Sequence, residues 1–185
     1  EYAFGQDIAD VAKFVGIDLG GARRLAPEVL VQKWLAILTE NQSFMRAMPT
    51  ARLAEPPVPN RPISTLSHGY HVFRIGEAFL DTVAGRDPDW HQNAMKFPEA
   101  VVRTADDAVR YGDEVKARLA AWWRDCPDKS LAGNVVTFQG EQSLHWFLER
   151  STWHSAQHTR QLANVLKERF GIEPQPALRA ETLAG

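Results

Sequence analysis

Cysteine is almost missing from this chain, which carries Cys126 and no other. A single thiol cannot close an intramolecular disulfide, and it excludes a metal site built from cysteines. Cys126 is followed by Pro127 and has no neighbouring histidine to activate it, so we interpret it as an incidental thiol near a helix end. This sparse use of cysteine fits a reducing cytoplasm.

Long apolar runs, a basic excess and a phosphate-binding loop are also missing. No stretch is long enough to cross a bilayer, and no basic segment followed by an apolar one indicates a signal peptide. The 21 basic and 23 acidic side chains give a net charge of −2, which argues against a nucleic-acid binder. Gly20-Gly21 lacks the Lys-Ser/Thr that follows in a phosphate loop. We therefore expect neither a membrane nor a nucleic acid as a partner.

The 185 residues suffice for one domain with a sizeable core. Four segments show helical apolar spacing, and we expect helices at about Pro27 to Met48, Ile63 to Ala84, Thr104 to Arg124 and Gln142 to Phe170. A short helix is expected around Asn93, and Val135–Phe138 is expected to form a single extended piece, too little for a sheet. Four long amphipathic helices predict an all-α bundle.

We expect this bundle to occupy residues 25–172. Residues 1–24 lie outside the plain bundle and are expected to form an N-terminal arm with a short helix at Asp7–Val15, or the end of a linker from an upstream domain. The chain begins at Glu1 rather than Met, so we expect it to be processed, trimmed or cut from a longer polypeptide. Residues 173–185 are expected to form an irregular tail.

Two histidines of the fourth segment are the strongest chemical signal. His154 and His158 are four residues apart, so a helix places both imidazoles on one face with Cβ atoms about 5–6 Å apart. They share an inward stripe with Leu144, Phe147, Ser151, Leu162 and Val165. A buried imidazole needs a hydrogen-bond partner or a metal, although such a pair alone is a weak motif. Ser155 stands where zinc proteases carry glutamate, which argues against protease chemistry.

The second segment offers a third ring nitrogen from either His68 or His71. His68 shares a stripe with Val72, Ile75 and Phe79, whereas His71 shares one with Ile75, Ala78 and Thr82, whose smaller side chains leave room for a ligand. For at least one of the two, the favoured interpretation is a satisfied polar residue at the helix surface, and the choice stays open. We interpret His91 and His145 as solvated.

The run "ERSTWHSAQHTRQLANVLKERFGIEP", with His154 and His158, and the run "LSHGYHVFRIGEAFL", with His68 and His71, resemble the DinB-like family. The resemblance implies an up-down-down-up four-helix bundle of the DinB/YfiT kind. In that family a histidine of the second helix joins an HxxxH pair of the fourth to bind a divalent metal. The resemblance thus makes His71, His154 and His158 the expected ligands, with His68 as the alternate to His71.

Relatives in this family include enzymes that use mycothiol, bacillithiol or glutathione. The resemblance implies a metal-dependent thiol S-transferase, isomerase or hydrolase acting on a small molecule, with zinc or nickel, or else iron or manganese, at the site. Arg74 and Arg160, each near an expected ligand, are candidates to hold a carboxylate of the thiol or substrate. The alternatives are a non-catalytic metal-binding stress-response module and a metal-free bundle. Because family members often pair through helix faces, a homodimer is expected.

Overall fold

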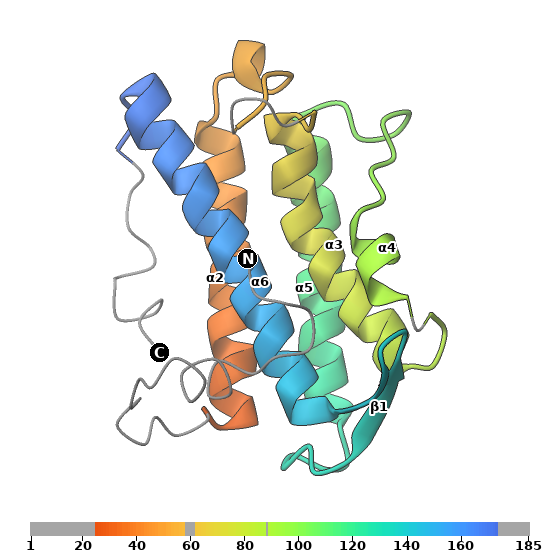
Figure 1. The fold of residues 1–185 in the computed structure, drawn as a ribbon. Helices are drawn as coiled ribbons and strands as arrows, with labels where there is room; N and C mark the ends of the chain where they lie inside the picture. Colours follow the sequence, from red (N-terminus) through yellow and green to blue (C-terminus); the bar gives the residue numbers. More distant parts are fainter. Residues whose placement is uncertain (1–24, 58–61, 88, 174–185) are drawn as a thin grey trace, which may run out of the picture.

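The structure, a computed structural model, describes residues 25–57, 62–87 and 89–173. Four long helices lie side by side (Figure 1): α2 (Pro27–Ala47), α3 (Thr65–Val83), α5 (Ala105–Asp125) and α6 (Leu144–Asn164). The shorter elements are the 3-10 turn η1 (Thr50–Arg52), helix α4 (Trp90–Ala94), strands β1 (Asn134–Thr137) and β2 (Gly140–Ser143), and the π-helical turn η2 (Val165–Arg169). The expected arm at 1–24, with its short helix, and residues 174–185 of the expected tail lie outside the described residues.

The long helices begin where the sequence supplies a cap. The side chain of Ser64 accepts a hydrogen bond from the Ser67 backbone N–H at 3.0 Å, which caps α3. Thr104 and Asp107 form a reciprocal capping box at the start of α5, and Pro27 occupies the first turn of α2. The predicted helices therefore begin close to their expected positions, and the all-α class is confirmed.

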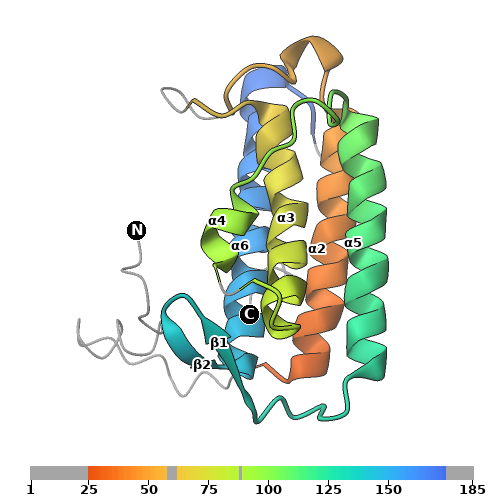
Figure 2. The ribbon, with the colours of Figure 1, turned by 90° about the vertical axis from the view of Figure 1, so that its right-hand side faces the viewer.

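The connection before α6 differs from the sequence prediction. Instead of a single extended piece at Val135–Phe138, strands β1 and β2 pair antiparallel, with Thr137 opposite Gly140. Gly140 turns the chain with a φ of 93°, a conformation that L side chains rarely adopt. The second strand is short and polar, so no apolar alternation marks it. In Figure 2 this hairpin and α4 lie on the same side of the bundle.

Helices α3 and α6, which carry the four candidate histidines, pack against each other, and both α2 and α3 pack against α5. Glycine allows the close approach of α3 and α5, because a Cβ at Gly112 would lie 2.6 Å from the Phe73 ring. Trp34 of α2 donates its indole N–H to Ser155 Oγ at 2.9 Å within the core, which anchors α6 next to His154. No helix in the described ranges is both long and apolar enough to cross a bilayer.

Candidate metal centre

Three histidines from α3 and α6 come together. Taking one ring nitrogen from each, the nitrogens of His71, His154 and His158 all lie within 4.8 Å of one another. The ring centroid of His71 is 5.4 Å from that of His154 and 4.9 Å from that of His158, and the two α6 rings are 4.8 Å apart. A tetrahedral zinc ion with Zn–N bonds of about 2.0–2.1 Å needs its nitrogens about 3.3 Å apart. Three imidazoles gathered in this way can hold a metal ion.

Hydrogen bonds orient two of these three rings. The Nδ1–H of His71 donates to the carbonyl oxygen of Ala94 at 2.8 Å, and the Nδ1–H of His158 donates to Oε1 of Gln161 at 2.9 Å. An imidazole whose Nδ1 carries the proton presents Nε2 as a lone pair, which is the form that binds a metal. The Nε2 atoms of His154 and His158 face each other at 2.9 Å.

Burial favours the neutral forms of His71 and His154. Burial, followed by the nearby His158 imidazole, lowers the pKa of His71 from its ordinary 6.5 to about 4. The same two causes lower the pKa of His154 to about 2. Neutral imidazoles at physiological pH need not lose a proton before they bind an ion. All three histidines are partly exposed.

His68 lies outside this cluster, although it precedes His71 by one helical turn. Its side chain is 2% exposed, and its Nε2–H donates to the backbone carbonyl of His158 at 3.2 Å. The two rings also meet edge-on with centroids 4.8 Å apart. His68 therefore contacts α6 from the core and supports the position of His158.

Arg74 holds the short helix α4 against α3. Its guanidinium donates to the backbone oxygen of Asn93 at 2.9 Å and also contacts the side chains of Asn93 and Glu77. The carbonyl oxygen of the next residue, Ala94, accepts the hydrogen bond from the Nδ1–H of His71. The donors of Arg74 thus act within the protein, and its predicted contact with a substrate carboxylate stays a prediction.

A different arginine lies beside the cluster and was not singled out by the sequence analysis. Arg150 precedes His154 by four residues on α6, and its guanidinium carbon lies 5.3 Å from the Trp90 ring centroid and 5.6 Å from that of Trp146. The four-residue step to His154 is the signal that could have found it. Arg160, the candidate on the other side of the pair, is exposed, and its substrate role stays a prediction.

The two histidines interpreted as solvated are both partly buried. The ring of His91 lies 5.8 Å from that of Trp90 and 6.2 Å from that of Phe138 in the hairpin turn. The imidazole of His145 contacts the carbonyl oxygen of Leu25 at 2.8 Å through Nε2. Neither belongs to the three-histidine cluster, but His91 borders it and contributes to the lowered pKa of His71.

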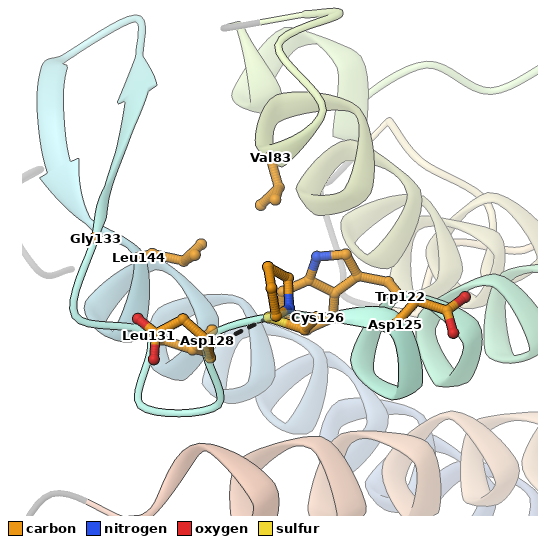
Figure 3. Close-up of a pocket in the computed structure, with 9 residues that line it drawn as sticks. Val83, Trp122, Asp125, Cys126, Asp128, Leu131, Gly133 and Leu144 are labelled. Atoms are coloured by element: carbon orange, nitrogen blue, oxygen red, sulfur yellow. Dashed lines mark hydrogen bonds between the residues drawn. The ribbon is translucent and has the colours of Figure 1, made fainter.

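A separate cavity of about 360 Å³ lies where α3 and α5 end and α6 begins (Figure 3). It lies about 18 Å along α3 from His71, because its wall includes Val83, twelve residues further on. The thiol of Cys126 lines it and donates to the carbonyl oxygen of Asp128 at 3.3 Å. No histidine lines this cavity, so it is distinct from the candidate metal centre.

A comparison with known protein families shows the superfamily to which the chain belongs. The model of the DinB superfamily matches residues 26–162, from the start of α2 into the last turn of α6, including all three clustered histidines. The chain belongs to the DinB superfamily. Comparison with curated proteins and with solved structures finds no match.

The donor set of this DinB protein suits a divalent ion. Three imidazole nitrogens converge, and no carboxylate among the described residues joins the cluster. Imidazole is a ligand common to zinc, nickel, iron and manganese sites, so the chemistry of the donors fits the metal binding typical of DinB-like proteins without selecting one metal.

Proposed function

We propose that this DinB protein binds one divalent metal ion through His71, His154 and His158. The observation that carries the proposal is the convergence of three ring nitrogens from two helices. We assign the third ligand to His71 rather than to His68, because the Nε2 of His68 is directed to the His158 carbonyl. Zinc and nickel are the first candidates and iron and manganese the next, since imidazole binds all four.

We further propose that the protein catalyses a thiol-dependent transfer, isomerisation or hydrolysis of a small molecule. When bound, a divalent ion supplies Lewis acidity, which lowers the pKa of a thiol that reaches it. Ala94 and Gln161 fix the rings of His71 and His158, and the partial exposure of the cluster supports access for glutathione, mycothiol or bacillithiol.

We infer that the four helices form the up-down-down-up bundle of the DinB/YfiT kind. Helices α2 and α6 run in one direction, and α3 and α5 run in the other (Figure 1). This sequence of helix directions supports the inference. Helix α3, which carries His71, also packs against α6. The cytoplasmic location and the homodimer stay predictions.

The experiment compares metal-free protein with protein reconstituted with zinc or nickel, all prepared without a His tag. Thiol consumption is measured with glutathione and a soluble electrophile, and the melting temperature is measured in parallel. We expect metal to raise the melting temperature and to be required for turnover. Uptake of metal without turnover for any of the three thiols would favour the non-catalytic module. If neither metal is taken up, the metal proposal is wrong.

A further inference from the structure

We propose that Arg150, whose guanidinium lies over the rings of Trp90 and Trp146 one helical turn from His154, receives a carboxylate group of the small molecule that occupies the metal centre. The inference rests on the proposed function, because it requires an ion at the three histidines. It goes further by naming a substrate class: a compound with one atom for the metal and an anionic group for Arg150.

The geometry of α6 places the guanidinium beside the cluster. Residues four apart on a helix share a face, with Cβ atoms about 5–6 Å apart, so Arg150 and His154 project from the same side. The two indole rings lie 5.3 and 5.6 Å from the guanidinium carbon, which holds the group by cation–π attraction. A guanidinium carries several N–H donors in its plane, and two of them can bind both oxygens of a carboxylate.

The charges at the site favour an anionic ligand. The lowered pKa values of His71 and His154 favour their neutral forms, and no carboxylate of the described residues belongs to the cluster. The positive charge of Arg150 already contributes to the lowered pKa of His154. A divalent ion would place further positive charge near Arg150, whose pKa is lowered because burial removes part of its side chain from water. A ligand with negative charge offsets this repulsion.

Trp90 provides an independent indication of a missing acceptor. Its side chain is 4% exposed, and its indole N–H is buried without a hydrogen-bond acceptor among the described residues. Buried donors in folded proteins are normally paired, so an unpaired one calls for an explanation. A carboxylate bound beside Arg150 would offer acceptor oxygens close to this indole, whose ring lies under the Arg150 guanidinium.

The test uses two thiols that share the metal-binding atom and differ in the anionic group. The full chain is loaded with Co²⁺, and 3-mercaptopropionate and 2-mercaptoethanol are titrated while the cobalt–thiolate absorption is followed. We expect the thiol acid to bind at least about tenfold more tightly than the thiol alcohol, because it adds charge-assisted hydrogen bonds. In Arg150→Met this preference should be lost, and in Arg150→Lys it should be partly kept.

The controls separate recognition from folding. Arg124→Met removes the same charge at a side chain that is 73% exposed on α5, and it should keep the full preference. Arg150→Met should still bind one Co²⁺, at least as tightly as the unchanged protein, because a like charge has been removed. An unchanged thiol preference in Arg150→Met, or a loss of its metal, would overturn the inference. If the unchanged protein takes up no Co²⁺, the proposed function fails first, and the absent cobalt spectrum shows this directly.

Discussion

The Nε2 atoms of His154 and His158 lie 2.9 Å apart on successive turns of α6. Two lone pairs repel at that distance, so in the absence of a metal one ring carries its proton on Nε2 and donates a neutral N–H···N hydrogen bond to the other ring. The Nδ1–H of His158 donates a hydrogen bond to Oε1 of Gln161, so the Nε2 of His158 is an acceptor. Without a metal, the Nε2–H of His154 therefore donates to this acceptor, and the properties of the centre depend on each ring, on pH and on the Ala94 carbonyl behind His71.

Single replacements should separate the clustered histidines from His68. We expect His71→Ala, His154→Ala and His158→Ala each to lose most of the bound metal, because two imidazoles hold an ion poorly. His68→Ala should keep near-stoichiometric metal but lose about 1–3 kcal/mol of stability, because a buried hydrogen-bonded side chain is removed. Elemental mass spectrometry measures the metal, and urea unfolding measures the stability. Loss of metal in His68→Ala with retention in His71→Ala would reverse the assignment.

The stability of the metal-free protein should depend on pH in the acidic range. The pKa values of His71 and His154 are lowered from 6.5 to about 4 and about 2 on folding, so the unfolded chain binds more protons below pH 6.5. Stability is therefore full above about pH 6.5 and falls as the pH drops toward 4, by about 1.4 kcal/mol per pH unit for each histidine. Denaturant unfolding at several pH values measures this slope.

The control for this slope is the double variant His71→Asn, His154→Asn, which should flatten the profile between pH 6.5 and 4. A profile of the unchanged protein that is already flat in this window would show that the two imidazoles are not held neutral.

Arg74→Met should weaken metal binding without touching a ligand. The substitution removes the contacts to Asn93, so the Ala94 carbonyl behind His71 is less well held. Loss of such a supporting contact typically costs about 10–100-fold in metal affinity, and competition with a chromogenic chelator measures it. Arg86→Met, at a side chain that is 58% exposed, is the matched control. Unchanged metal affinity together with weaker substrate binding would instead support the carboxylate contact predicted for Arg74.

Gly112→Ala should destabilise the packing of α3 on α5. The added methyl would lie 2.6 Å from the Phe73 ring, which is fully buried and has little freedom to move. Overpacking of this kind costs about 1–3 kcal/mol, measurable by thermal or urea unfolding. Gly133→Ala, where nothing lies within 4 Å of the new Cβ, should change stability by less than about 1 kcal/mol. Equal effects at the two positions would contradict the close approach.

The starts of the long helices were predictable because their capping residues lie next to them in the sequence. A cap such as Ser64 or Thr104 satisfies backbone N–H groups of its own helix, so the signal and the structure it specifies lie within four residues. The spacing of His154 and His158 likewise placed both rings on one face. The hairpin could not be predicted in this way, because β2 is stabilised by pairing with β1 and carries no apolar pattern of its own.

The choice between His68 and His71 as the third ligand depended on information outside their own helix. His68 and His71 are three residues apart and project from α3 only about 60° apart, so both can face a neighbouring helix. Which ring reaches the pair on α6 is decided by the relative position of the two helices. The four-residue step from Arg150 to His154 is visible in the sequence, but the contact of Arg150 with Trp90, sixty residues earlier in the chain, is set by tertiary packing and was not predictable.

The carbonyl that orients His71 comes from α4, a five-residue helix in the connection between α3 and α5. Segments of this kind tolerate insertion and replacement better than packed helices do. Substitutions in this connection would therefore alter the environment of the His71 imidazole, and with it the choice of metal or substrate, while the interior of the protein stays the same. Divergence among paralogues would then be concentrated at residues 86–103 and be sparse in the helices that carry the histidines.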